Sequence, residues 1–368
     1  MSTDDPYAER LDRTREAMAA VGADLLVCAP SPTMRYLAGW TEHPSERHLL
    51  LFVTDDDVLF LAPEMYGDQL EADSWVPSIQ TWDDGDDPRA LIEALAADLE
   101  IGDGRVLVDD RMWARFTFDL RGAIPDASFG LASAVTTDLR IRKDDTELDR
   151  LREAARITDA VCVELRELGE EAIGLTERDL AEEIERRLSA HGGEGNSFEP
   201  IVGSGPNGAR PHHGHGDRTI ERGDPVVLDF GTLVDGYPGD QTRTVVFAGD
   251  PPEGYEEVHE TVLNAHHAGV DAVEPGVTAE SIDRAAREVI EDAGYGDEFL
   301  HRTGHGVGLE VHEPPYIVEG NDRELEPGMV FSVEPGIYLE GEFGVRIEDL
   351  VVVTENGCER LNDTPRTW

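Results

Sequence analysis

Hydrophobic and polar positions over about the first 140 residues alternate between two spacings, one typical of helices and one typical of strands. Apolar residues at helical spacing predict helices over 7–21 and 88–99. Short apolar runs bounded by polar and glycine-containing segments predict strands over 23–28, 35–37, 49–53, 58–62 and 106–108. Helices and strands that follow one another in this way indicate an α/β domain.

The second part of the chain begins after a polar segment, 140–145, in which Ile141 is the one apolar residue. A long amphipathic pattern over 147–168 predicts a helix, and Thr176 with Asp179 three residues later resembles a capping box that starts another. Two further helices are predicted over 255–272 and 278–293, with strands and glycine-rich turns between and after them. We therefore expect two domains, 1–142 and 143–368.

Composition and charge narrow the range of partners. The 368 residues correspond to about two domains, and 79 acidic against 31 basic residues give a net charge of −48. This charge repels phosphate backbones and anionic lipids, so nucleic acids and membrane surfaces are disfavoured as partners. Acidic residues are spread along the whole chain and Lys143 is its single lysine. Such a composition resembles that of proteins adapted to molar salt; an acidic protein from a high-GC genome is the alternative.

Neither the start of the chain nor its cysteines indicates secretion. The first residues are acidic and polar, whereas a secretory signal needs a basic start and an apolar stretch. The longest apolar runs, such as 48–53, fall far short of the roughly 20 residues of a membrane span. Cys28, Cys162 and Cys358 are odd in number and far apart, which predicts small buried residues instead of disulfides or a thiolate metal site. We expect a soluble cytoplasmic protein.

Five segments of the second half each place a candidate metal ligand at a strand end or in a tight turn. These residues are Asp229, Asp240, His305, Glu334 and Glu348. Each alone is explained by a structural role, such as a cap or a turn. Carboxylates at the inner ends of neighbouring strands, however, would repel one another unless a cation or proton compensated them. Four carboxylates and one imidazole suit a pair of divalent ions, Mn²⁺ first, with Co²⁺, Zn²⁺ or Fe²⁺ as alternatives.

These motifs, in this order, resemble the pita-bread metallopeptidases, the family of aminopeptidase P, prolidase and methionine aminopeptidase. The matching segments are 226–231, 239–244, 304–308, 331–336 and 345–349. The first part of the chain is similar to the creatinase/prolidase N-terminal domain. The resemblance implies an α+β protein in which a C-terminal pita-bread domain follows an α/β N-terminal domain. It also implies that Asp229 holds one metal, that His305 and Glu334 hold the other, and that Asp240 and Glu348 bridge the two.

The same resemblance assigns roles to residues beside the ligands. His212, at the end of the segment 204–212, matches a histidine that binds near the scissile peptide. His312 matches a second catalytic histidine, His301 a third histidine of the pocket, and Arg346 an arginine of proline-specific members. Two further histidines, at positions 213 and 215, lie beside His212, and the sequence leaves open which of the three contacts substrate. The chain also departs from the family pattern at 215–216, where it has His-Gly in place of the common Pro followed by Ser or Thr.

The resemblance implies a metallopeptidase that hydrolyses the peptide bond preceding proline. The enzyme would be an Xaa-Pro dipeptidase or an Xaa-Pro aminopeptidase, acting on short proline-containing peptides as a homodimer. A water activated between two ions would attack the carbonyl, with Glu334 accepting its proton and His212 or His312 stabilising the oxyanion. One alternative is a hydrolase of another small amide or ester on the same site. The other is a non-catalytic peptide-binding protein of the same fold.

Overall fold

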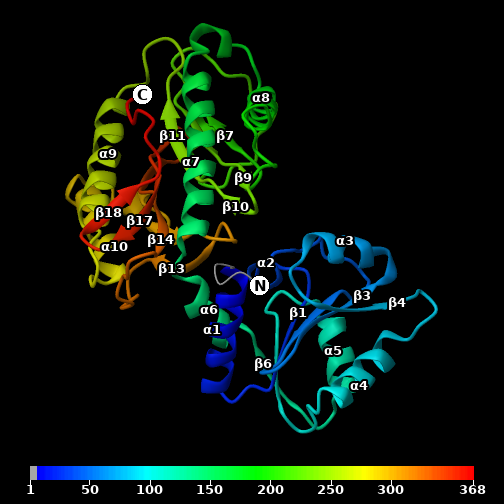
Figure 1. Ribbon diagram of the computed structural model, residues 1–368. Helices are drawn as coiled ribbons and strands as arrows, with labels where there is room; N and C mark the ends of the chain where they lie inside the picture. The colour runs from blue at the N-terminus through cyan, green and yellow to red at the C-terminus, as the bar shows by residue number, and fades with distance from the viewer. Residues whose placement is uncertain (1–5) are drawn as a thin grey trace. The chain divides into compact units, whose positions relative to one another are not determined.

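A computed structural model describes residues 6–368, which divide into two compact units (Figure 1). The first unit ends at Arg140, and the second runs from Ile141 to Trp368. No helix within the described residues is both long and apolar enough to cross a membrane.

The first unit contains a mixed six-stranded sheet in the order β4-β3-β2-β1-β5-β6. Its strands are β1 (Leu25–Cys28), β2 (Leu50–Val53), β3 (Val58–Pro63), β4 (Ser78–Trp82), β5 (Arg105–Val108) and β6 (Ser128–Leu131). Its helices are α1 (Pro6–Ala20), α2 (Pro32–Ala38), α3 (Gly67–Asp73), α4 (Pro88–Asp98), α5 (Ala114–Ala123) and α6 (Ser133–Arg140), with a 3₁₀ turn, η1 (Glu64–Tyr66). Buried residues of α4 and α5, among them Ile92 and Leu120, share one core with Val27 and Phe52 of the sheet.

The strand predicted over 35–37 is wrong, because these residues belong to helix α2. The Ser31 side chain accepts a hydrogen bond from the Met34 backbone N–H, and Pro32 occupies the first turn, where it needs no N–H partner. Gly39 ends the helix in the left-handed conformation, with φ 71°. These start and stop signals outweigh a short apolar run that fits either kind of element.

The second unit combines sheets with two pairs of helices. Its helices are α7 (Asp145–Arg166), α8 (Glu177–Ala190), α9 (Tyr255–Asp271) and α10 (Ala279–Asp292), with the 3₁₀ turns η2 (Gly169–Ala172), η3 (Gly205–Ala209) and η4 (Gly296–Glu298). Three antiparallel strands in the order β11-β8-β7 form one sheet, and five in the order β13-β12-β14-β17-β18 form another. Two-stranded ribbons pair β9 with β10 and β15 with β16.

The strands of the second unit are short, and their bounds place several ends close in sequence to polar residues. They are β7 (Ile201–Ser204), β8 (Val226–Phe230), β9 (Leu233–Val234), β10 (Tyr237–Pro238), β11 (Gln241–Val245), β12 (Gly304–Gly306), β13 (Glu313–Ile317), β14 (Val330–Val333), β15 (Gly336–Leu339), β16 (Phe343–Arg346), β17 (Asp349–Thr354) and β18 (Gly357–Arg360). Apolar residues of α7 and α8 pack against β7, β8 and β11, whereas those of α9 and α10 pack against β14, β17 and the β15–β16 ribbon. Figure 1 shows the four helices around these strands.

Two helix starts follow the capping-box pattern. Thr176 and Asp179 form the box that the sequence predicted at the start of α8. Helix α7 begins two residues earlier than predicted because Asp144 and Glu147 form a second box, in which each side chain accepts a hydrogen bond from the other residue's backbone N–H.

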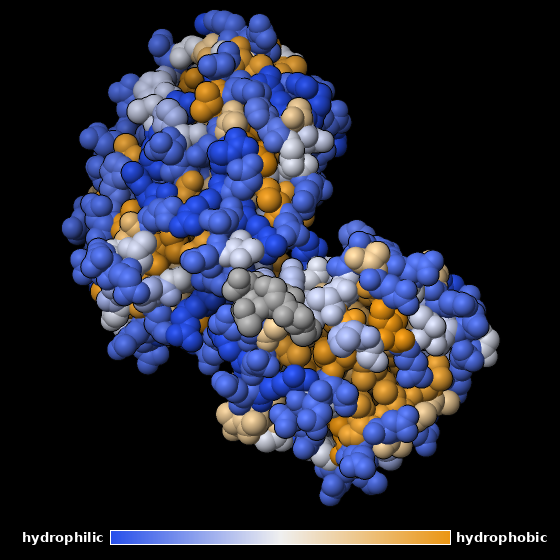
Figure 2. All heavy atoms as spheres, in the orientation of Figure 1, coloured by the Kyte–Doolittle hydropathy of each residue, from blue (hydrophilic) through white to orange (hydrophobic). Residues whose placement is uncertain are grey.

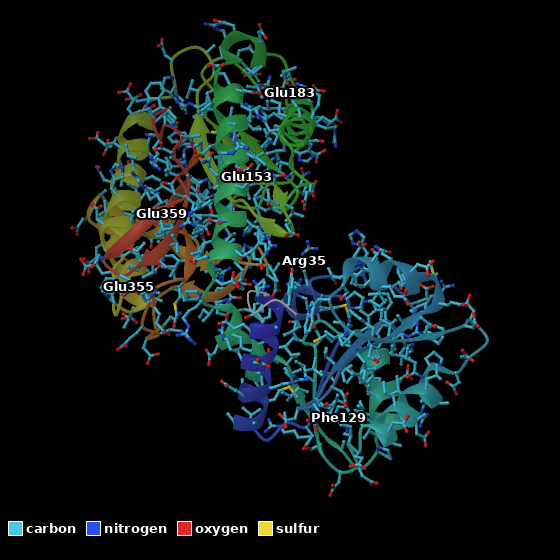
Figure 3. All side chains as sticks on the ribbon, viewed as in Figure 1. Arg35, Phe129, Glu153, Glu183, Glu355 and Glu359 are labelled. Carbon is cyan, nitrogen blue, oxygen red and sulfur yellow. The ribbon has the colours of Figure 1, made fainter. Side chains whose placement is uncertain are left out.

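The surface of the second unit is largely hydrophilic on the face that Figure 2 shows. Glu153, Glu183 and Glu355 project outward from it (Figure 3), and Glu153 pairs with Arg156 on the next turn of α7.

The three cysteines of the chain lie far apart in the sequence. Cys28 and Cys162 are fully buried and Cys358 is half-buried, and all three are free thiols, as the sequence predicted.

Candidate active site

A cavity of about 590 Å³ lies in the second unit, and the five candidate metal ligands line it together with the four residues that the resemblance places beside them. These residues are His212, Asp229, Asp240, His301, His305, His312, Glu334, Arg346 and Glu348. They come from segments far apart in the sequence, so the fold brings them together.

The candidate ligands stand in or beside paired strands. Asp229 lies in β8 opposite Thr242 of β11, and Asp240 immediately precedes β11. His305 is the middle residue of β12, which pairs with β14, and Glu334 follows β14 directly. Glu348 immediately precedes β17, which pairs with the other edge of β14. The two sheets therefore point their acidic ends into one space.

Glycines on both sides of His305 permit this close strand packing. A Cβ atom on Gly304 would lie 1.8 Å from the Ser332 carbonyl oxygen, and one on Gly306 would lie 2.3 Å from the Pro314 carbonyl oxygen. Any side chain at either position would push the neighbouring strands apart. The Gly-His-Gly sequence thus lets the histidine reach the carboxylates.

Ligand atoms of Asp240, His305 and Glu348 all lie within 4.8 Å of one another, in buried surroundings. The Nε2 atom of His305 is 3.3 Å from Glu334 Oε1 and 3.7 Å from Asp240 Oδ2. Its Nδ1 atom lies 3.3 Å from the Gly306 carbonyl oxygen. A proton on Nδ1 would be donated to that carbonyl, which leaves Nε2 as the free donor atom that faces the carboxylates.

Burial and the repulsion between neighbouring carboxylates shift the pKa values of this cluster. Burial, followed by the negative charge of neighbouring carboxylates, raises the pKa values of Asp240 and Glu348 well above their ordinary range. Burial also raises the pKa of Glu334 to about 7, although Arg346 counteracts it. For the imidazole of His305, burial and the neighbouring His312 lower the pKa to about 3. A bound cation would reverse the raised pKa values of the three carboxyls and would find the His305 imidazole already neutral.

The donor set fits divalent metal ions. Besides the raised carboxyl pKa values, the Oδ1 atom of Asp229 is buried without a hydrogen-bond partner in the described structure. A buried carboxylate oxygen of this kind is costly unless a proton or a cation meets it. Hard oxygen donors with one imidazole are typical of Mn²⁺ and similar ions.

Neighbouring hydroxyls orient these carboxylates. Thr242 Oγ1 donates to Glu348 Oε2 at 2.6 Å and accepts from Arg346 Nε at 3.0 Å. Ser332 Oγ donates to Glu334 Oε1 at 3.2 Å and accepts from the His305 backbone N–H at 3.1 Å. Glu334 and Glu348 are therefore each held by a hydroxyl outside the cluster, as is usual around metal sites.

Arg346 connects the cluster to His301 through a tyrosine that the sequence did not reveal. Its Nη2 donates to Asp229 Oδ2 at 2.6 Å and its Nη1 to Tyr338 Oη at 2.9 Å. Tyr338 Oη lies 2.8 Å from His301 Nε2, and burial together with Arg346 lowers the pKa of His301 to about 4. The one sequence signal for Tyr338 is its position in the β15–β16 hairpin that ends at Arg346.

The three neighbouring histidines have different surroundings. His212 lines the cavity. His213 Nε2 is 2.8 Å from Glu177 Oε2, and His215 Nδ1 is 2.9 Å from the Pro200 carbonyl oxygen. Of the three, His212 is thus the one placed to contact a bound molecule.

Several lining residues were not predicted. They are Phe198, Ile201, Pro211, Arg302 and Val311. The guanidinium carbon of Arg302 lies 4.4 Å from the centre of the Tyr316 ring. Arg302 follows His301 directly in the sequence, but a single arginine in a loop carries no signal of its own.

Fold and site together define a metallopeptidase with a two-unit chain. The chain belongs to metallopeptidase family M24, whose model matches residues 149–355. A creatinase/prolidase N-terminal domain model matches residues 10–142. The predictions of the family, of the two fold types and of a metallopeptidase are confirmed.

Its relatives include named dipeptidases over nearly the whole length. The chain is 40% identical to the "Probable dipeptidase PepE" of Mycobacterium tuberculosis, covering 98% of this chain and 95% of that one. It is 35% identical to the "Xaa-Pro dipeptidase" of Lactobacillus delbrueckii subsp. lactis, covering 97% of each. The crystal structure of a recombinant prolidase from Thermococcus sibiricus superposes with a TM-score of 0.93 at 36% identity, covering 100% of this chain and 99% of that one.

Proposed function

We propose that this chain is an Xaa-Pro dipeptidase, a dinuclear metallopeptidase that hydrolyses the peptide bond preceding proline. The observation that carries the proposal is the one cavity in which three buried carboxylates, the half-buried Glu334, one buried imidazole and three further histidines converge. The names of the relatives support the same substrate class.

In this proposal the metal ligands are Asp229, Asp240, His305, Glu334 and Glu348, with Mn²⁺ as the expected metal. Asp229 would serve one ion, His305 and Glu334 the other, and Asp240 with Glu348 would serve both. Two bound ions would supply an activated water and polarise the scissile carbonyl. Burial and neighbouring carboxylates raise the pKa values of Asp240 and Glu348, and this supports a site that binds cations.

The residues of the chain itself would move the proton and hold the substrate. Glu334 would accept the proton of the attacking water, since its carboxylate lines the cavity and its Oε1 lies 3.3 Å from His305 Nε2. His212 and His312 line the cavity and would donate hydrogen bonds to the developing oxyanion. Arg346 and His301 would keep Asp229 and Tyr338 in place.

Apolar lining residues provide a surface for the proline ring. Phe198, Ile201 and Val311 line the same cavity as the carboxylates. A tertiary amide offers no N–H for recognition, so a site for it depends on ring contact instead of a backbone hydrogen bond. Arg302, in the same lining, would meet the free carboxylate of a dipeptide.

We further propose a domain boundary between residues 142 and 143, a homodimer and a cytoplasmic location. The family resemblance supports the dimer, and the three free thiols suit a reducing compartment. The net charge of −48 and the single lysine support adaptation to high salt.

The test compares hydrolysis of Ala-Pro, Ala-Pro-Ala and Ala-Ala with Mn²⁺ in molar KCl, with and without a chelator. We expect metal-dependent cleavage of Ala-Pro that Glu334→Gln abolishes. The surface variant Glu355→Gln is the matched control and should keep full activity. Release of alanine from Ala-Pro-Ala would instead show an aminopeptidase. No metal-dependent cleavage of either proline peptide would favour another amide or ester substrate, or a binding protein.

A further inference from the structure

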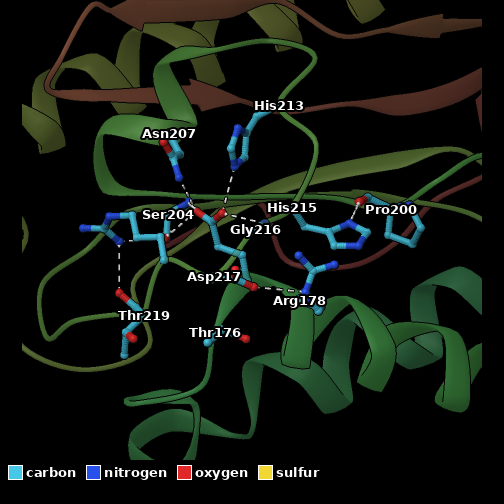
Figure 4. A network of polar contacts seen from close by, with 12 residues as sticks. Thr176, Arg178, Pro200, Ser204, Asn207, His213, His215, Gly216, Asp217 and Thr219 are labelled. Carbon is cyan, nitrogen blue, oxygen red and sulfur yellow. Dashed lines mark hydrogen bonds and ion pairs between the residues drawn. The ribbon is translucent and has the colours of Figure 1, made fainter.

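The Glu177 side chain at the start of α8 is fully buried, and donors from one loop surround it. Its carboxylate contacts Ser204, Asn207, His213 and Gly216, the four partners that Figure 4 labels. These four residues belong to the segment that leaves β7 and passes along the cavity. The carboxylate thus lies at the back of the loop that carries His212.

Both carboxylate oxygens of Glu177 are used. Oε1 accepts from the Ser204 backbone N–H at 2.9 Å, from Ser204 Oγ at 2.7 Å and from Asn207 Nδ2 at 2.9 Å. Oε2 accepts from the Gly216 backbone N–H at 3.1 Å and lies 2.8 Å from His213 Nε2. One oxygen therefore holds the loop before His212, and the other holds it after.

The charge state of Glu177 suits this role. Burial alone would raise its pKa, but the hydrogen bonds from His213, Ser204 and Asn207 outweigh burial and lower it. An ionised carboxylate makes charge-assisted hydrogen bonds, which are stronger than neutral ones. Arg218 adds to the same network by donating to Ser204 Oγ at 2.6 Å while it pairs with Asp224.

The stretch between the two anchored ends contains the residues that face the cavity. Pro211 and His212 line it, and the Pro211 carbonyl oxygen accepts from Arg346 Nη1 at 3.3 Å. The His215-Gly216 departure from the family pattern falls within the second anchor. A Cβ on Gly216 would lie 3.7 Å from Glu177 Oε2, an ordinary contact, so the backbone N–H is what this position supplies.

We propose that Glu177 is a positioning residue that, through Ser204, Asn207 and His213, holds His212 at the distance needed to contact the scissile peptide. This inference rests on the proposed function, because it assumes that His212 acts on the substrate. A misplacement of about 1 Å at a reacting group can cost roughly 100-fold in rate. A buried anchor behind the loop therefore has consequences for activity far larger than its distance from the cavity suggests.

The first test is Glu177→Gln, which keeps the shape and replaces an acceptor oxygen by a donor. We expect kcat/KM for Ala-Pro to fall about 10- to 100-fold while the bound metal, measured by elemental analysis, stays unchanged. The five candidate metal ligands lie on other elements, so a loss of metal would contradict the proposal. Glu183→Gln on the same helix is the matched control, since Glu183 pairs with Arg186 and Arg187 at the surface.

A double-mutant cycle separates positioning from a general loss of stability. If Glu177 acts through His212, Glu177→Gln should lower kcat/KM in the wild-type background and change it less than twofold in a His212→Ala background. Independent, multiplied losses in the double variant would overturn the proposal.

A second pair of variants covers the case in which Glu177→Gln does not fold. His213→Gln keeps a donor toward Glu177, and His213→Leu removes it, so only the second should show the loss in kcat/KM. Hydrogen exchange over 205–216 gives a readout that needs no activity. Faster exchange confined to this segment in His213→Leu supports the anchor, and unchanged exchange refutes it. Failure of the wild type to cleave Ala-Pro would refute the proposed function and leave this measurement valid.

Discussion

At the scale of single residues, the two arginines of the cavity differ in what surrounds them. Arg346 is held by Asp229 and Tyr338 and supports the ligand cluster. Arg302 lies over the Tyr316 ring and lines the cavity. A guanidinium held on an aromatic ring keeps its donors available for a carboxylate. Arg302 is therefore the side chain that would separate a dipeptide from a longer peptide.

We predict that Arg302→Met raises the KM for Ala-Pro about 10- to 100-fold, because a hydrogen bond to a charged group is worth roughly 1.5–3 kcal/mol. The matched substrate is Ala-Pro amide, which lacks the carboxylate and whose KM should stay within about twofold of the wild-type value. Steady-state kinetics on both substrates checks this. Equal losses on the acid and the amide would show that Arg302 does not bind the carboxylate.

The residues predictable from the sequence are those that sit in contiguous motifs. His305 is flanked by glycines, and Asp229 ends an apolar run, so both stand out without a structure. Glu177, Arg302 and Tyr338 do not stand out, because their roles come from contacts with residues distant in sequence. In the sequence, Glu177 is an ordinary acidic residue in the first turn of a helix. Its role becomes visible only when its hydrogen-bond donors are known.

At the scale of elements, helix boundaries follow from capping chemistry more closely than from periodicity. Thr176 and Thr278 are both N-cap residues with extended backbone. The Thr176 side chain accepts a hydrogen bond from the Asp179 backbone N–H at 3.1 Å, whereas the Thr278 side chain makes no capping hydrogen bond. The sequence distinguishes these two starts, because Thr176 has an acidic residue three positions later and Thr278 does not.

We predict that Thr176→Ala lowers the free energy of unfolding by about 1 kcal/mol, since it leaves the first turn of α8 without its cap. That loss corresponds to a fall in Tm of roughly 2–4 °C for a unit of this size. Thr278→Ala is the matched control and should change Tm by less than half as much. Thermal unfolding followed by circular dichroism measures both, and equal shifts would contradict the capping argument.

Misread elements have the same origin. The segment 35–37 looks like a strand by its apolar residues, but Ser31, Pro32 and Gly39 set a helix around it. Sheet order is harder still, because the pairing of β1 with β2 on one side and β5 on the other joins segments separated by whole helices. The spacing of apolar residues predicts where helices and strands lie, whereas long-range packing decides which strands pair.

At the scale of the whole molecule, charge is the dominant property. A net charge of −48 gives strong self-repulsion, which salt screens. The screening length falls from about 30 Å at 0.01 M to about 3 Å at 1 M. Side chains such as Glu153 and Glu183 lie on the outer surface, where that screening acts (Figure 3).

We predict that Tm and peptidase activity both fall when KCl is reduced from molar to about 10 mM, and that both recover when salt is restored. NaCl at equal ionic strength should restore Tm equally if screening is the cause. Circular dichroism and Ala-Pro hydrolysis at each concentration check this. An unchanged Tm at 10 mM would refute adaptation to high salt.

The single lysine has a consequence for chemical labelling. The Lys143 side chain is fully buried, and its Nζ lies 2.8 Å from Glu313 Oε1. Acylating and cross-linking reagents attack neutral, accessible amines, so this ε-amine is shielded from them while the second unit stays closed. Every other basic side chain of the chain is a guanidinium or an imidazole. The rate at which Lys143 is acylated therefore reports how often the second unit opens. Mass spectrometry of the one peptide that contains Lys143 measures this rate.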